Sequence, residues 1–306
     1  MFFGMTSPNA PSGLYIHLGL HRTGSSALQD CLHLNKAAIE DAGLLVSVAR
    51  RDGAGQNPVR LRMPGPGEFG KNLHRLAFRR DRALRKRGIT AANCAILSEE
   101  NLIGNMSAAL RERPYRLAGR RLAFLAEGLN APIRRVLIVV RGYGPFAASL
   151  YRKRCEFNLM PPFSDLADGF LRSSRGWVDL IEDIRVGLAP EEMVVLRHED
   201  QTPPLSVARH LAPSLVELSL TPLERRVNAS VPDAALEALQ EAFRRDENLS
   251  HEDRLELIDA HAGRDGPSIA SIPPSLSATL EDRYMRDLDV IAAMPGVQMP
   301  DPRPAT

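Results

Sequence analysis

The chain has 306 residues, of which 44% are hydrophobic and 25% are charged, a composition typical of a globular protein with a large buried core. Its formal net charge of +2 is too small to favour nucleic acid or a membrane surface as a partner. Any anion site must therefore be built from locally placed basic residues.

The N-terminal segment, residues 1–13, lacks the basic region and the long apolar stretch of a signal peptide. The most apolar run, residues 136–140, is much shorter than the roughly 20 residues that a membrane helix needs. Cys31, Cys94 and Cys155 are far apart and show no CxxC spacing, which favours a reducing compartment. We therefore expect a cytoplasmic protein without membrane spans, and the dominance of arginine over lysine indicates a GC-rich bacterial source.

Short apolar runs typical of buried strands alternate along the chain with segments of helical length. The strands are expected at residues 14–20, 44–48, 94–97, 136–140 and 193–196. The helices are expected at residues 26–35, 69–87, 116–129, 145–154, 177–186 and 232–245. This alternation predicts an α/β fold with three layers, in which a central, mainly parallel sheet carries helices on both faces.

The C-terminal part is predicted to be helical from about residue 250. Ser250 and Asp253 have the spacing of a capping box, and Ser277 is expected to cap a last helix that ends near Met294. Residues 296–306 are rich in proline and are expected to form a flexible tail. We therefore expect one domain over residues 1–295.

A glycine-containing turn lies between the first predicted strand and the first predicted helix, in the segment YIHLGLHRTGSSALQDCL. Gly19 and Gly24 have the separation of the G-x-x-x-x-G-K-[ST] phosphate loop, with Ser25 in the place of the lysine. Backbone N–H groups in such a turn point inward, and the helix dipole adds positive potential, so the turn favours an anion. The missing lysine disfavours an ATPase or a GTPase.

The same turn resembles the phosphate loop of bacterial sulfotransferases that use 3'-phosphoadenosine 5'-phosphosulfate (PAPS), which have the form K-x-G-T-T. In HRTGSSALQ, Arg22 takes the place of the lysine, and the two serines take the places of the threonines. Arginine keeps the charge and serine keeps the hydroxyl. The resemblance implies a P-loop-type fold and PAPS binding by Arg22, Thr23, Gly24, Ser25 and Ser26.

A second resemblance lies in RRVLIVVRGYGPFAASLYRKR, where a predicted strand ends at Arg141 and Pro145 is placed to open a helix. In sulfotransferases an arginine at a strand end and a serine eight positions later hold the 3'-phosphate of the nucleotide. Arg141 and Ser149 have this spacing, so the resemblance implies the same role. Only the 3'-phosphate distinguishes PAPS from ordinary adenosine nucleotides, and arginine can bind it through paired, charge-assisted hydrogen bonds.

The resemblance extends over about residues 14–245, with weaker matches in the helix, strand and turn WVDLIEDIRVGLAPEEMVVLRHED and in PLERRVNAS. Glu199 and Asp200 of that turn are expected to cap local structure. Arg225 and Arg226 either approach the nucleotide or form a solvated basic turn.

Sulfuryl transfer needs a base for the acceptor hydroxyl and positive charge beside the departing phosphate oxygen. Arg22 is the candidate for the second task. The segment SEENL, at the end of the strand over residues 94–97, resembles a bacterial sulfotransferase motif and makes Glu100 the candidate base. Glu99 and His74 remain alternatives.

The resemblance thus predicts transfer of a sulfuryl group from PAPS, without a metal, to a hydroxyl or amine of an acceptor, with a glycan or glycolipid favoured. The basic segment at residues 75–87 either attracts an anionic acceptor or forms a solvated helix face. Two alternatives remain open, a P-loop kinase and a nucleotide-binding protein without turnover. Neither nucleic acid nor an integral membrane association is expected.

Overall fold

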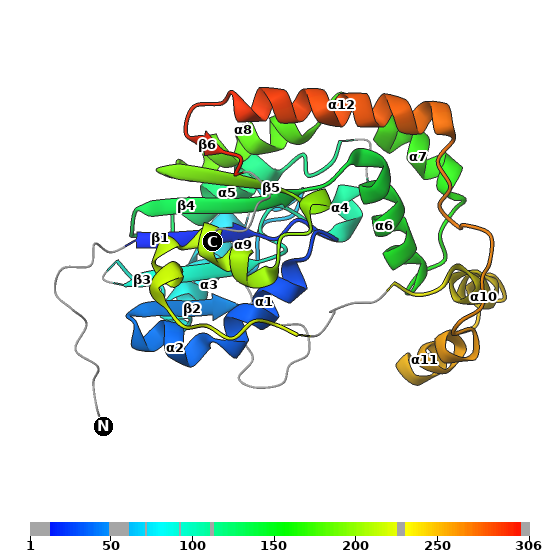
Figure 1. Ribbon diagram of the computed structural model, residues 1–306, viewed down its shortest axis with the longest axis horizontal. Coiled ribbons are helices and arrows are strands. Elements are labelled where there is room, and N and C mark those ends of the chain that lie inside the picture. The colour runs from blue at the N-terminus through cyan, green and yellow to red at the C-terminus, as the bar shows by residue number, and fades with distance from the viewer. Residues whose placement is uncertain are drawn as a thin grey trace.

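Six parallel strands form one central sheet in the computed structural model, with the order β2-β3-β1-β4-β5-β6 (Figure 1). The structure describes residues 13–48, 61–70, 72–91, 93–110, 113–224 and 230–300. The strands are β1 (Gly13–Leu18), β2 (Leu44–Val48), β3 (Cys94–Glu99), β4 (Ile133–Val140), β5 (Glu192–Arg197) and β6 (Val297–Gln298). The α/β prediction is therefore confirmed, and the first five strands lie where the apolar runs placed them.

Helices cover both faces of the sheet and form the outer two layers (Figure 1). One face carries α1 (Ser25–Leu34), α2 (Lys36–Asp41) and α9 (Pro204–Leu211), which pack on an apolar cluster of their own. The opposite face and its ends carry α3 (Leu73–Lys86), α4 (Met106–Ala109), α5 (Ala118–Ala126), α6 (Tyr143–Cys155), α8 (Trp177–Leu188) and α12 (Pro274–Ala292). The remaining helices are α7 (Phe163–Leu171), η1 (His198–Asp200), η2 (Pro213–Glu217), α10 (Asp233–Arg244) and α11 (His251–Ala260).

The central strands are buried on both faces, which explains why they are almost continuously apolar in sequence. Leu14, Ile16 and Leu18 of β1 are fully buried, as are Val136 and Ile138 of β4. Burial of each such side chain contributes about 1.5–3 kcal/mol relative to leaving it exposed. The sheet is therefore a rigid support for the loops at its edges.

The outer helices are amphipathic. The longest, α12, buries Leu280, Tyr284, Leu288 and Ile291 at spacings of three and four residues, which place them on one helical face. Within the described residues, no helix combines the length and the apolar character needed to cross a membrane.

Two details of the C-terminal part differ from the prediction. α12 begins at Pro274, whose missing N–H suits the first helical position, so Ser277 lies inside the first turn and does not cap the helix. The expected flexible tail over residues 296–306 is wrong for Val297 and Gln298, which pair with β5 as the edge strand β6. Backbone pairing can recruit a segment that has no apolar pattern of its own. The predicted capping box is confirmed, because Ser250 and Asp253 cap α11 reciprocally.

The connections that leave β1 and β4 diverge at the carboxyl edge of the sheet. These two strands are neighbours, but β1 leads into α1 on one face and β4 leads into α6 on the other. Ligands of open α/β sheets bind in the crevice at such a switch point. The turns after β1 and β4 are the two segments in which the sequence predicts phosphate contacts.

Candidate functional site

The turn after β1 is closed by its own side chains. The carbonyl oxygen of Leu20 accepts hydrogen bonds from Thr23 Oγ1 at 2.7 Å and from Ser25 Oγ at 3.1 Å. Gly24 precedes α1 with φ 92°, a left-handed conformation that glycine adopts without steric cost. Arg22 is also left-handed, with φ 64°. A non-glycine residue in this conformation costs on the order of 1–3 kcal/mol, and such strain clusters at functional sites.

The turn after β4 is joined to this turn by two arginines. Arg141 Nη1 donates to the carbonyl oxygen of Arg22 at 3.0 Å, and Arg22 Nε donates to Ser149 Oγ at 3.0 Å. Burial lowers the pKa of Arg141; nearby Glu199 acts in the opposite direction, and nearby Arg22 lowers the pKa further. Two partly buried guanidinium groups that repel one another create a position where a bound anion would be stabilised.

A cavity of about 270 Å³, here called the anion cavity, lies at this junction. Its lining residues come from the turn after β1 and the start of α1, from the residues that follow β3, β4 and β5, from α6 and from the segment before α10. They are Arg22, Gly24, Ser25, Ser26, Ala27, Glu100, Arg141, Ser149, His198 and Ser230. Every site residue predicted from the sequence lines it except Thr23. The tertiary structure therefore brings both predicted phosphate anchors and the candidate base to one place.

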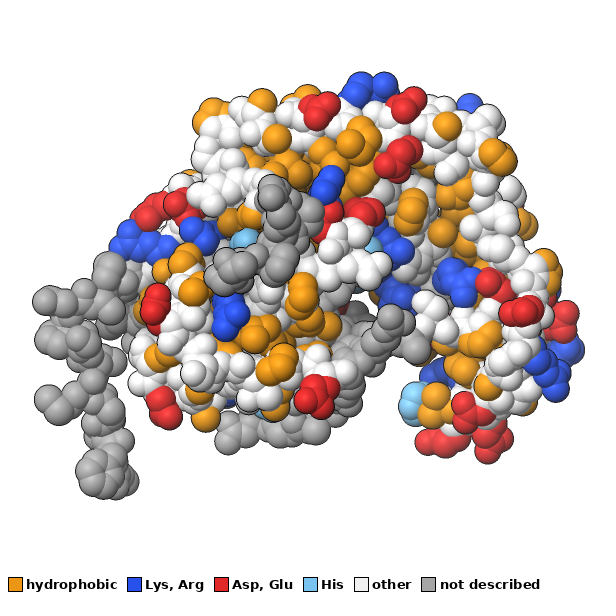
Figure 2. Space-filling view, in the orientation of Figure 1, with side chains coloured by type: hydrophobic (Ala, Val, Ile, Leu, Met, Phe, Trp, Pro, Cys, Tyr) orange, Lys and Arg blue, Asp and Glu red, His pale blue; other side chains and the backbone are white. Residues whose placement is uncertain are grey.

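Basic side chains extend beyond the anion cavity. A neighbouring cavity of about 220 Å³ is lined by Arg22 and Arg141 together with Arg152 and Lys153. Figure 2 shows basic side chains gathered on the surface between the sheet and the helices α10 and α11. Arg152 is paired with Asp233, and Lys153 with Glu156. Arg152 and Lys153 are thus paired with carboxylates, whereas Arg22 and Arg141 line the anion cavity.

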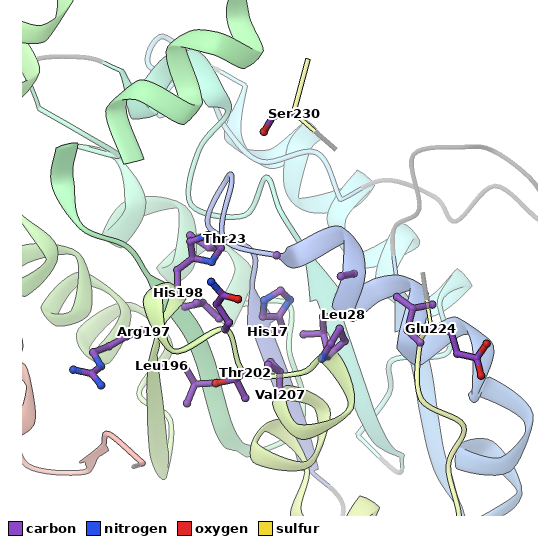
Figure 3. Close-up of a pocket in the computed structure, with 16 residues that line it drawn as sticks. His17, Thr23, Leu28, Leu196, Arg197, His198, Thr202, Val207, Glu224 and Ser230 are labelled. Atoms are coloured by element: carbon purple, nitrogen blue, oxygen red, sulfur yellow. The ribbon is translucent and has the colours of Figure 1, made fainter. Parts of the chain in front are cut away.

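A larger cavity of about 550 Å³, here called the large cavity, adjoins the anion cavity and lies between α1, α9 and the carboxyl edge of the sheet (Figure 3). Thr23 lines this cavity instead of the anion cavity. Gly24, Ala27, His198 and Ser230 line both. One extended ligand could therefore occupy the two cavities together.

The absence of a side chain at Gly19 allows the end of β3 to approach the phosphate loop. A Cβ atom at Gly19 would lie 2.8 Å from Glu100 Cγ and 2.9 Å from Ser25 Oγ. The Gly19 N–H donates to the carbonyl oxygen of Glu99 at 3.2 Å, which fixes the two segments side by side. Glycine at this position is what places Glu100 against the loop.

The three candidate bases occupy different environments. Glu100 is buried and lines the anion cavity. Glu99 points elsewhere: its carboxylate lies 3.3 Å from the buried Arg87 guanidinium, which also donates to Ser47 Oγ at 2.8 Å. His74 is exposed on α3 and lines neither cavity. The geometry thus favours Glu100 among the three.

Two polar lining residues, His198 and Ser230, were not among the predicted site residues, although each lies in one of the two segments of weaker resemblance. His198 follows β5 directly and lines both cavities, and burial, with contributions from Arg141 and Arg22, lowers its pKa. Its position at a strand end is the signal that could have identified it. Ser230 is the last residue of PLERRVNAS, and the resemblance of that segment is the signal that could have identified it.

The neighbouring turn residues have the structural roles expected of them. Glu199 accepts hydrogen bonds from the Gly142 N–H at 2.8 Å and from the Tyr284 hydroxyl at 2.9 Å, and Asp200 pairs with Arg197. The expectation that both carboxylates cap local structure is confirmed. Arg225 and Arg226 lie outside the described residues.

The basic segment on α3 is not a uniform solvated face. Arg80 is buried and pairs with Asp81 at 2.8 Å, while Arg87 is buried against Glu99. Arg75, Arg79, Arg82 and Arg85 are exposed. The two predictions for this segment, an attraction for an anionic acceptor and a solvated helix face, therefore concern only the exposed arginines.

Among the residues that the structure describes, no group of three or more His, Cys, Asp or Glu side chains is arranged to hold a metal ion. The chain matches no protein-family model and no curated protein. The fold and the geometry of the anion cavity are accordingly the basis for assigning a function.

Proposed function

We propose that this chain is a sulfotransferase that moves a sulfuryl group from PAPS to a hydroxyl or amine of an acceptor. The observation that carries the proposal is the meeting of Arg22, Arg141 and Ser149 at one cavity, at the switch point between β1 and β4. Their spacing along the chain resembles that of sulfotransferases, and their convergence in space supports a common ligand with two separate anionic groups.

The residues present fit such a nucleotide. The start of α1, from Gly24 to Ser26, offers backbone N–H groups and a helix dipole to the 5'-phosphosulfate. Arg141 and Ser149 offer a guanidinium and a hydroxyl to the 3'-phosphate. The large cavity shares four lining residues with the anion cavity and would receive the base.

The chemistry requires a new bond between the acceptor oxygen and sulfur while the bond from sulfur to the bridging phosphate oxygen breaks. Glu100 would take the proton that the acceptor hydroxyl loses during this attack. Arg22 would stabilise the negative charge that remains on the phosphate oxygen of the departing adenosine 3',5'-bisphosphate. Both side chains line the anion cavity, which places the two tasks beside one another.

The resemblance to bacterial sulfotransferases supports a glycan or glycolipid as the acceptor. The spacing of the three cysteines supports a reducing compartment, and hence the cytoplasm, as the site of action. The exposed arginines of α3 offer a surface for an anionic acceptor. No metal is assigned a role in this reaction.

Ligand-dependent thermal stability tests the nucleotide assignment. Adenosine 3',5'-bisphosphate is expected to raise the melting temperature more than adenosine 2',5'-bisphosphate or AMP, because a ligand stabilises the folded state according to its concentration relative to its dissociation constant. The 2',5'-isomer is the matched control, since it has the same charge and the same base. Equal shifts with all three ligands would refute recognition of the 3'-phosphate, and a larger shift with ATP and Mg²⁺ would favour the kinase alternative.

Turnover separates an enzyme from a nucleotide-binding protein without activity. Hydroxylated and aminated glycans can be screened with PAPS labelled in its sulfuryl group. Transfer of the label that depends on Glu100 and Arg22 supports the proposed reaction. Tight binding of the bisphosphate without transfer to any acceptor in the screen would favour the inactive alternative.

A further inference from the structure

The strands that form the floor of the large cavity contribute two polar side chains, His17 of β1 and Arg197 at the end of β5. Val139 of β4 and Leu196 of β5 are the apolar strand residues of this floor. The apolar residues Leu28 of α1 and Val207 of α9 form the walls, and Figure 3 shows the His17 ring among these side chains. A flat, mainly apolar ligand group in this cavity would therefore contact the imidazole of His17 at the floor.

His17 is held from behind by two buried polar groups. Its Nδ1 lies 2.8 Å from Ser98 Oγ, and the same oxygen accepts a hydrogen bond from Gln29 Nε2 at 3.3 Å. Ser98 and Gln29 are 0% and 3% exposed, so water does not replace these partners. His17 thus has a fixed ring orientation, in which Nδ1 faces the protein and Nε2 is the other nitrogen.

The contact between His17 and Ser98 fits either tautomer of a neutral imidazole, because the Ser98 oxygen can accept two hydrogen bonds or accept one and donate one. In the tautomer on which the proposal below is built, the Ser98 oxygen accepts from the Gln29 amide and donates its own hydrogen to His17 Nδ1. A neutral imidazole with an accepting Nδ1 carries its proton on Nε2. Burial lowers the pKa of His17 to about 4, so the ring is neutral at physiological pH. In this tautomer the floor offers the cavity an uncharged N–H donor.

We propose that His17 is a specificity residue that donates a hydrogen bond from Nε2 to a ring nitrogen of a purine base in the large cavity. The inference rests on the proposed function, because it takes the ligand of the adjoining anion cavity to be an adenosine nucleotide. A neutral donor beside the apolar side chains of Leu28 and Val207 suits the acceptor nitrogens of adenine. The cavity volume of about 550 Å³ also lies within the usual range for small-ligand sites.

Deaza analogues of adenosine 3',5'-bisphosphate test the proposal on the unmodified protein. In the 1-, 3- and 7-deaza compounds, one acceptor nitrogen at a time is replaced by C–H while the shape of the base is kept. One of the three is expected to bind about threefold to tenfold more weakly than the parent compound in isothermal titration calorimetry, the range for one neutral hydrogen bond. Equal affinities for all four compounds would overturn the proposal.

A variant then assigns the lost interaction to His17. His17→Phe keeps a planar ring without a donor, and it is expected to bind the parent compound and the discriminating analogue with equal affinity. Retention of the full discrimination in folded His17→Phe would overturn the role of His17. If this variant does not fold, the ¹⁵N spectrum of histidine-labelled protein decides the point: a proton on Nε2 that shifts when the bisphosphate binds is expected, and a proton on Nδ1 would overturn the assignment.

The outcomes separate this inference from the proposed function. If the parent bisphosphate binds and depends on Arg141 but the deaza compounds bind equally well, the nucleotide assignment stands and only the role of His17 fails. If the parent bisphosphate does not bind at all, the proposed function fails and the role of His17 fails with it.

Discussion

Replacement of Glu99 by glutamine is expected to destabilise the fold, because it removes the counter-charge of a buried arginine. The Glu99 and Arg87 side chains are 7% and 2% exposed, and Glu99 Oε2 lies 3.3 Å from Arg87 Nη1. Within the described residues, Arg87 Nη2 is buried without a hydrogen-bond partner. Among the described residues, Glu99 is the carboxylate that pairs with Arg87, and the other side chain that accepts from Arg87 is the neutral Ser47.

Removal of one partner from a buried ion pair typically costs about 3–5 kcal/mol. Glutamine keeps an oxygen that can accept from Arg87, so we expect the lower end, about 3 kcal/mol. For a chain of 306 residues, that loss corresponds to a melting temperature roughly 5 °C lower. Replacing both residues by apolar ones, as in the double variant Arg87→Met with Glu99→Leu, is expected to recover most of the loss, because it leaves no unpaired charge in the interior.

Urea and thermal denaturation, followed by circular dichroism, measure these changes, with Glu100→Gln as the matched control. Glu100 lines the anion cavity instead of pairing with Arg87, so its substitution is expected to change stability by less than about 1 kcal/mol while lowering turnover by about 100-fold to 10,000-fold. Affinity for adenosine 3',5'-bisphosphate should stay nearly unchanged. Parent-like stability of Glu99→Gln would refute the ion-pair reasoning, and turnover lost in Glu99→Gln or His74→Ala but kept in Glu100→Gln would show that the base is another residue.

Three other predictions follow from the site. Arg141→Ala should weaken binding of adenosine 3',5'-bisphosphate by about 1.5–3 kcal/mol in calorimetry, the range for hydrogen bonds to charged groups, and an unchanged affinity would contradict the assigned role. Gly19→Ala should destabilise the protein by about 1–3 kcal/mol in urea denaturation, because its Cβ would lie 2.8 Å from Glu100 Cγ; a parent-like midpoint would contradict this contact. The free energy of unfolding should fall as the pH drops from 6.5 to about 4, because unfolded His17 binds a proton in that window and the folded ring, whose pKa is lowered to about 4, does not. His17→Gln should remove up to about 3 kcal/mol of this pH dependence, and an unchanged slope would contradict it.

The strands and the phosphate loop could be predicted from the sequence because their determinants are local. A strand buried on both faces needs a continuous apolar run, and the run at residues 136–140 lies within β4. A tight turn before a helix needs a residue that accepts a left-handed backbone, and Gly24 adopts that conformation. The carboxyl ends of neighbouring parallel strands meet at one edge, so Arg22 and Arg141 could be expected to lie close together.

The tertiary structure decided what depends on contacts between distant segments. Glu99 and Glu100 are adjacent in sequence and chemically alike, and only the packing of Arg87 beside one of them separates an ion-pair partner from a cavity residue. His17 has a fixed ring orientation because Ser98, 81 residues away, lies next to it in the sheet, and it is neutral because the folded chain buries it. Val297 and Gln298 form a strand because β5 offers them an unpaired edge, and their own side chains carry no strand pattern. Local preferences determine which elements form, whereas the roles of individual polar residues depend on neighbours that only the folded chain supplies.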